Sequence, residues 1–206
     1  MTTKLPLPPE FYRRPAAEVA RDLLGRHLVR ILADGTRLEL SIVETEAYQG
    51  QGDRASHAWR GPVTPRSRRL FRDGGHAYVY LIYGMYLCLN AVTGTAEDGS
   101  AVLLRAGEAL AGAETMANLR GLPHPARPGE LASGPGRLAQ AIGLERDHDG
   151  CTLWQGDLVI AAGFPVPALQ VAATPRVGVD YAGEAARWPL RFVVRGNPAV
   201  SKPRVG

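Results

Sequence analysis

The stretch HLVRILADGTRLELSIVETEAY (residues 27–48) predicts two strands, 27–32 and 38–48, joined by a turn at 33–36. Apolar runs predict further strands over 77–92, with a break at Tyr83-Gly84, and over 101–106. Shorter strands are expected at 153–161, 171–173 and 190–194. Because hairpin-length loops join most of these strands, we expect a mixed α/β (α+β) fold with a mainly antiparallel, curved sheet flanked by helices.

Helices are predicted at 15–24, 108–120 and 136–142, each followed by a glycine that can end it. The chain has 206 residues, which suits one domain over 1–206 with residues 1–10 as an N-terminal tail. A long polar connection, 50–75, is expected to be functional. The loops 94–99 and 120–131 have no predicted role.

Composition excludes several classes of protein. No apolar run is long enough to span a membrane and the first ten residues carry no secretory signal, so a cytoplasmic protein is expected. Cys88 and Cys151 lack metal-ligand spacing, so neither a metal nor a disulfide is predicted, and Cys88 is expected to be buried.

The basic residues are almost all arginines. Two of the 24 are lysines, Lys4 and Lys202, which leaves 22 arginines, and the net charge is +4. Arginine binds phosphate better than lysine because its planar fork donates two parallel hydrogen bonds. A GC-rich genome would produce the same bias, so composition favours a nucleic-acid partner only mildly.

Alternation along 42–48 places Ile42, Glu44, Glu46 and Tyr48 on one strand face. Two carboxylates beside an aromatic ring can raise one pKa toward that of a general base. The alternative is an edge strand with a solvated acidic face.

Two neighbouring segments could hold a nucleic acid. Residues 54–72 contain six arginines, His57 and Trp59 and no acidic residue, which is typical of a phosphate-contacting loop or of a merely solubilising one. Residues 78–86 hold four of the seven tyrosines, a pattern that suits base stacking or a tyrosine-rich core strand. Together with the carboxylates, these segments supply what base excision requires. Since both lysines lie elsewhere, a water displacement fits better than a Schiff base.

Several motifs then identify a resemblance, and they are the segments 42–48, 64–68, 78–90, 102–106, 133–135, 176–179, 189–192 and 195–196. Their order along the chain, from about Phe11 to Ser201, closely resembles that of the alkyladenine (3-methyladenine) DNA glycosylase family, and the absence of a long N-terminal tail suits a bacterial member. The resemblance implies a fold similar to the C-terminal domain of methionyl-tRNA formyltransferase.

The resemblance also implies roles for the residues that line a base pocket. Glu46 matches the general base, which deprotonates water. Tyr48 and Tyr80 match the rings that sandwich a flipped base, and His57 the third wall. Asn90 matches the amide that discriminates against the exocyclic amine of guanine.

Further residues match positions that contact DNA. Arg105 matches a basic residue that helps place the water and contacts the phosphate of the lesion. Tyr83 matches the residue that wedges into the duplex, and Thr64, Arg66 and Met85 match DNA-contact positions near it.

The expected protein is therefore a monomeric, cofactor-free, nucleoid-associated hydrolase. Its expected partner is double-stranded DNA that contains an alkylated or deaminated purine. One alternative is a non-catalytic damaged-DNA binding module, against which the intact Glu46 argues. A formyl or acyl transferase is a second alternative, but no glycine-rich cofactor motif supports it.

Overall fold

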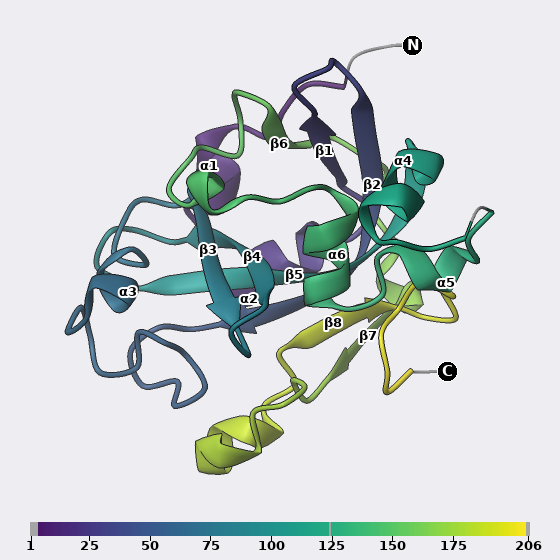
Figure 1. Ribbon diagram of the computed structural model, residues 1–206. Helices are drawn as coiled ribbons and strands as arrows, with labels where there is room; N and C mark the ends of the chain where they lie inside the picture. Colours follow the sequence, from purple (N-terminus) through teal and green to yellow (C-terminus); the bar gives the residue numbers. More distant parts are fainter. Residues whose placement is uncertain (1–3, 124, 205–206) are drawn as a thin grey trace.

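The computed structural model describes residues 4–123 and 125–204, and its central strand is β2 (Arg37–Tyr48). One edge of β2 pairs with β5 (Ser100–Ala111). The other edge is shared, because β1 (His27–Ile31) pairs with the first part of β2 and β8 (Arg191–Val194) pairs with Glu44–Glu46 (Figure 1). The site is therefore built on a strand with partners on both sides.

Among the described residues, eight strands form one open sheet in which every pairing is antiparallel. The main path runs β3-β4-β5-β2-β1-β6, and β7 joins it through β8. The remaining strands are β3 (Ala77–Ile82), β4 (Tyr86–Thr93), β6 (Leu158–Ala161) and β7 (Val171–Thr174). The predicted mixed fold with a mainly antiparallel sheet is confirmed.

A β-bulge in β2 changes the predicted pattern of faces. The register with β5 shifts between Ile42 and Thr45, so the alternation of side chains is interrupted there. Ile42 packs in the main apolar core together with Ala47, an odd number of residues away. The prediction that Ile42 shares a face with Glu44 and Glu46 is therefore wrong, since both glutamates instead contact Arg105.

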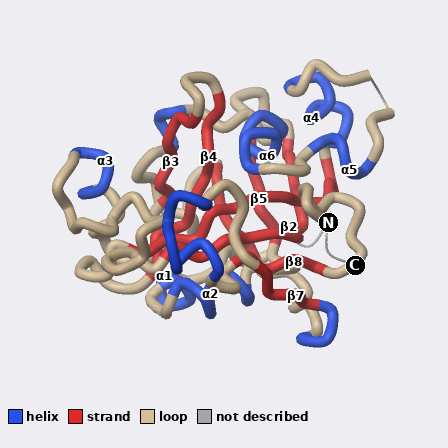
Figure 2. The backbone as a smooth tube through the Cα atoms, turned by 90° about the horizontal axis from the view of Figure 1, so that it is seen from below, coloured by secondary structure: helices blue, strands red, loops and turns tan. Residues whose placement is uncertain are grey.

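Short helices flank the sheet. Helices α2 (Ala16–Asp22) and α6 (Pro135–Ala141) lie on opposite sides of β5, as Figures 1 and 2 show from two directions. The other helices are α1 (Pro9–Tyr12), α3 (Pro65–Arg68), α4 (Ala113–Leu119), α5 (Pro128–Leu131) and the 3-10 helices η1 (Arg146–His148), η2 (Ala168–Gln170) and η3 (Asp180–Arg187). No helix among the described residues is long and apolar enough to cross a membrane.

Three predicted elements have different bounds. The helix expected at 108–120 begins only at Ala113, because β5 continues to Ala111 against β2 and Gly112 turns the chain at a φ of 77°. The strand expected at 153–161 is confined to β6. Within the predicted tail, residues 1–3 lie outside the described residues, whereas Leu7 is buried and its N–H bonds to the carbonyl of Ile160.

Candidate active site

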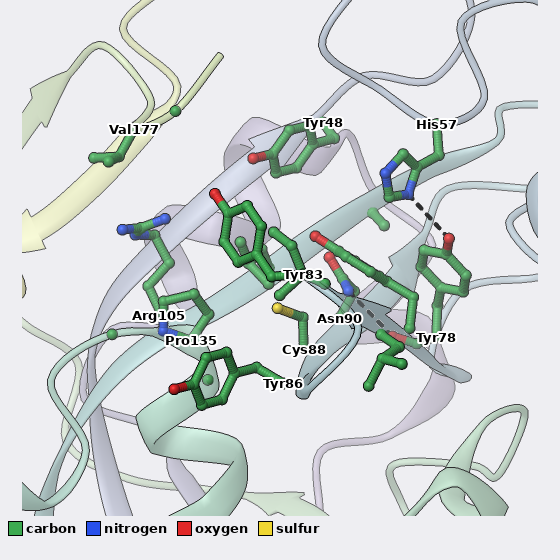
Figure 3. Close-up of a pocket in the computed structure, with 18 of the residues that line it drawn as sticks. Tyr48, His57, Tyr78, Tyr83, Tyr86, Cys88, Asn90, Arg105, Pro135 and Val177 are labelled. Atoms are coloured by element: carbon green, nitrogen blue, oxygen red, sulfur yellow. Dashed lines mark hydrogen bonds between the residues drawn. The ribbon is translucent and has the colours of Figure 1, made fainter.

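A cavity of about 910 Å³ opens beside the ends of β3, β4 and β5. Side chains from β2, β5 and the long connection 49–76 point into it, among them Tyr48, Arg105 and His57 (Figure 3). Its volume lies in the range of pockets that bind small molecules. Other lining residues include Tyr78, Tyr80, Cys88, Asn90, Pro135, Val177 and Tyr181.

Glu46 lies directly behind the wall of this cavity and has no exposed surface. Its Oε2 accepts a hydrogen bond of 2.9 Å from the Tyr48 hydroxyl, and its Oε1 accepts one of 2.7 Å from the backbone N–H of Val177. Nη1 of Arg105 lies 3.3 Å from Oε2. All three partners line the cavity, so the carboxylate is one residue layer from its interior.

Arg105 connects Glu46 with the second carboxylate, Glu44, which Nε of Arg105 contacts at 2.8 Å. Burial favours a lower pKa for Arg105, but Glu46 and Glu44 outweigh it and raise the pKa. Burial likewise favours a higher pKa for Glu44, yet Arg105, the N–H of Ser201 and Arg191 lower it. Glu44 is thus held as a carboxylate and Arg105 as a guanidinium.

The alternative of a solvated acidic edge strand is wrong. Glu44 and Glu46 are both fully buried, and β2 has paired neighbours on both edges at these residues. Burying two carboxylates requires compensating charges and donors, which Arg105 and Arg191 supply.

Three aromatic rings line one part of the cavity. Tyr48 stands on β2, Tyr80 on β3, and His57 on the connection 49–76. His57 and Tyr80 meet edge to face, with centroids 4.7 Å apart and planes at 80°. Guanidinium groups lie over two of these rings: Arg176 lies 4.7 Å from the Tyr48 ring and Arg66 lies 4.6 Å from that of Tyr80. One face of each tyrosine ring is therefore covered by a positive charge.

His57 stands at the mouth with part of its ring exposed. Partial burial and the charge of Arg66 lower the pKa of His57 to about 4, so its imidazole is neutral near pH 7. Its Nδ1 lies 3.0 Å from the Tyr78 hydroxyl, which also accepts from Nε of Arg66 (Figure 3). Because Tyr78 already accepts from Arg66, its own proton is best directed at Nδ1, which leaves the hydrogen of His57 on Nε2.

Asn90 is buried at the floor of the cavity, where Nδ2 donates to the backbone carbonyl of Tyr78 over 3.1 Å. The neighbouring Cys88 is also buried, as predicted, and burial raises the pKa of its thiol. Both side chains line the cavity from β4.

The turn between β3 and β4 presents Tyr83 to solvent. Tyr83 has a positive φ of 53° and is 81% exposed, and Met85 beside it is 67% exposed. A non-glycine residue in the left-handed region is uncommon, and here it projects an apolar ring at the rim of the cavity. The predicted break at Tyr83-Gly84 is confirmed.

The predicted DNA-contact positions 64 and 66 lie at α3, and Arg66 lines the cavity. Thr64 caps α3 through a reciprocal pair of hydrogen bonds with Ser67, and Arg66 reaches back to Tyr78 and Tyr80. The basic segment 54–72 is partly neutralised, since Arg69 forms an ion pair of 2.5 Å with Asp149. The segment itself contains no acidic residue, so the charge that compensates Arg69 comes from a distant part of the chain.

A buried ion pair supports the site, and the sequence did not identify it. Arg176 binds both oxygens of Asp53, at 2.5 and 2.9 Å, and neither side chain is exposed. The same guanidinium faces Tyr48, and the next residue, Val177, bonds to Glu46. The sequence singled out the motif 176–179 but gave it no role. The pairing could not be predicted, because Asp53 lies more than a hundred residues away from Arg176.

The cavity also extends beyond the three rings, toward α6. Tyr86, Arg120 and Arg137 line this second part. Within the described ranges, 4–123 and 125–204, no group of three His, Cys, Asp or Glu side chains is arranged to hold a metal ion.

Comparison with known proteins shows which family the sequence matches. The family model described as methylpurine-DNA glycosylase matches residues 10–198. A Methanocella arvoryzae protein, provisionally named a 3-methyladenine DNA glycosylase, is 50% identical over 97% of this chain and 98% of its own length. A Bdellovibrio bacteriovorus protein with the same provisional name is 45% identical over 95% and 98%. The Mus musculus DNA-3-methyladenine glycosylase is 48% identical over 95% of this chain, which spans 61% of the mouse protein.

Proposed function

The chain belongs to the methylpurine-DNA glycosylase family, and from this we propose that its cavity receives a damaged purine flipped out of double-stranded DNA. As a member it is a DNA glycosylase, a hydrolase of N-glycosyl bonds that acts in base excision repair. The proposed substrates are alkylated or deaminated purines: 3-methyladenine, 7-methylguanine, hypoxanthine and ethenoadenine. We propose that the protein acts as a monomer.

The observation that carries the mechanism is the buried carboxylate of Glu46 behind the wall of the cavity. The 3.3 Å between Nη1 of Arg105 and Oε2 of Glu46 is the longest of the three contacts of this carboxylate. A water molecule in the cavity that contacts both groups from the same side would meet an acceptor and a donor at once. We assign Glu46 as the general base and Arg105 as the group that orients this water.

The proposed reaction is a hydrolysis in which all atoms are accounted for. Oxygen of water bonds to C1′ of the sugar, and its proton passes to Glu46. The glycosidic bond breaks, and its electron pair leaves with the purine. An N3- or N7-alkylated purine carries positive charge, so it departs as a neutral base without an added proton. A neutral lesion such as hypoxanthine must instead take up one proton as it leaves. The ionised Glu46 also stabilises the oxocarbenium character that develops at the sugar.

The rings of Tyr48, Tyr80 and His57 are the proposed walls of the base slot. A cationic purine is attracted to the electron-rich faces of tyrosine, which favours alkylated over normal bases. The neutral imidazole of His57 can donate from Nε2 to the bound nucleotide, because Nδ1 is directed at Tyr78. Asn90 is proposed to reject guanine by occupying the space that its exocyclic amine needs.

Tyr83 is proposed to insert into the duplex at the position that the flipped nucleotide vacates. Its exposure and its place in a tight turn allow the ring to enter the base stack, where stacking is worth about 1–3 kcal/mol. Met85 would contact the neighbouring base pair, and Thr64 and Arg66 would contact the DNA near this wedge.

Excision of a defined base tests this function. Duplexes that each carry one hypoxanthine or one methylated purine are incubated with excess protein, and alkali then cleaves the strand at abasic sites. We expect a cleaved product from lesion duplexes and none from an undamaged duplex. Binding of the lesion duplexes without any cleavage would instead identify a damaged-DNA binding module.

A further inference from the structure

Glu44 is the most enclosed charged group next to the proposed catalytic pair, and it does not line the cavity. Its carboxylate accepts four hydrogen bonds: 2.8 Å from Nε of Arg105, 2.8 Å from Nε of Arg191, and 2.7 and 2.9 Å from N and Oγ of Ser201. Because no substrate can reach it, any effect of Glu44 on the reaction must pass through these donors.

One of those donors also meets the proposed general base. One edge of the Arg105 guanidinium is fixed, because Nε donates to Glu44 and Nη2 donates to Oγ of Ser201 over 3.3 Å. The guanidinium is planar and rigid, so fixing this edge leaves little freedom for Nη1. Nη1 is the atom that lies 3.3 Å from Glu46.

A second buried guanidinium, that of Arg191, donates hydrogen bonds to the same cluster. Arg191 donates from Nε to Glu44 and from Nη2 to the carbonyls of Ser201 and Pro203, at 3.1 and 2.9 Å. Arg191 thereby anchors the chain segment that brings Ser201 to Glu44. The cluster contains two carboxylates and two guanidinium groups, so its formal charges balance: Glu44, Glu46, Arg105 and Arg191.

We propose that Glu44, held by Arg191 and Ser201, is a positioning residue that sets the orientation and the charge balance of Arg105 against Glu46. This inference rests on the proposed function of Glu46 as general base. With Glu44 neutral, Arg105 would lose the ionic contact that fixes its orientation. Its positive charge would then interact with Glu46 alone. The ion pair between Nη1 of Arg105 and Oε2 of Glu46 would then tighten and exclude the proposed water, and the reaction would slow while the base slot stayed intact.

The test is the substitution Glu44→Gln, which keeps the shape of the side chain and removes its charge. We expect the single-turnover rate constant at saturating protein to fall about 10- to 100-fold, as is usual for residues that orient a catalytic group. The dissociation constant for a hypoxanthine duplex should change less than about threefold. Removing an anion beside the base favours its ionised form, so the acid limb of the pH–rate profile should move to lower pH.

Glu39→Gln is the matched control, because Glu39 lies on the same strand and pairs with His27 and Arg37 away from the cavity. It should leave the rate constant, the affinity and the acid limb unchanged. Ser201→Ala tests the inference separately if Glu44→Gln does not fold, since it removes only the Oγ contacts to Glu44 and Arg105. It should slow excision about 3- to 10-fold, and Ser201→Thr should restore the rate.

A wild-type rate constant in Glu44→Gln would overturn the proposal. So would a loss of rate accompanied by an equal loss of binding and an unmoved acid limb, which indicates only a disturbed fold. Equal rates in Ser201→Ala and the wild type would also overturn it. None of these outcomes affects the proposed function, which fails only if the wild-type protein excises no lesion.

Discussion

The hydroxyl of Tyr48 donates a hydrogen bond of 2.9 Å to Oε2 of Glu46, two residues earlier on the same strand. Residues two apart on a strand share a face, so β2 presents both side chains toward the cavity. A ring proposed to stack on the base is thereby tied to the carboxylate proposed to activate water. Burial and then the charge of Glu46 raise the pKa of Tyr48, so its hydroxyl remains a donor.

Tyr48→Phe should separate these two roles. It keeps the ring but removes a hydrogen bond to a buried charged group, which is worth about 1.5–3 kcal/mol. We expect the free energy of unfolding in urea to fall by about that amount, while affinity for a lesion duplex is retained. Tyr181→Phe is the control, because Tyr181 is exposed and its hydroxyl donates only a long hydrogen bond of 3.5 Å to the backbone carbonyl of Ala55. An unchanged stability in Tyr48→Phe would contradict the hydrogen bond.

Tyr83→Ala should weaken capture of a lesion in duplex DNA about tenfold or more, because the stack is no longer filled. Binding of a lesion that is already unpaired should be spared. Titration with labelled duplex and single-stranded oligonucleotides measures both affinities. Phe164→Ala provides the control, since Phe164 is 82% exposed, like Tyr83 at 81%, but lies away from the cavity. Equal losses on both substrates would show that Tyr83 is no wedge.

The pKa of His57, lowered from 6.5 to about 4, makes the fold sensitive to acid. Between these values the unfolded chain binds a proton that the folded protein does not, so unfolding becomes easier as pH falls. The wild type should therefore lose more stability than His57→Asn between about pH 7 and about pH 5. Urea unfolding of both proteins across this range measures the difference. Parallel curves would mean that His57 titrates normally.

Asp53→Asn should destabilise the protein strongly, because it leaves Arg176 buried without its partner. Breaking a buried ion pair costs about 3–5 kcal/mol. Asp73→Asn breaks the half-exposed pair with Arg13 instead and should cost less than about 1 kcal/mol. Chemical unfolding of the two variants compares these costs. A similar, small loss in both would show that the Asp53 pair contributes little.

Local patterns predicted the parts of the site that lie close together in the chain. The spacing of Glu46 and Tyr48 placed them on one face, and the glycine after Tyr83 predicted the turn that exposes its ring. Both follow from the two-residue period of a strand and from the chemistry of tight turns. The proposed roles of these residues remain predictions, drawn from the family resemblance.

Contacts between distant segments could not be predicted in the same way. Glu44 accepts hydrogen bonds from Arg191 and Ser201, which are 147 and 157 residues away. The bulge in β2 occurs where its partner changes from β1 to β8, and the local sequence gives no indication of that change. Residues 108–111 look helical, but pairing with β2 outweighs their helical preference.

The most direct test of the proposed mechanism is single-turnover excision by Glu46→Gln, with binding of the same lesion duplex measured in parallel. The amide fills the same space but cannot take a proton from water. We expect the rate constant to fall by about 10²- to 10⁴-fold with lesion affinity retained. Near-wild-type excision by Glu46→Gln would contradict the assignment and place the general base elsewhere.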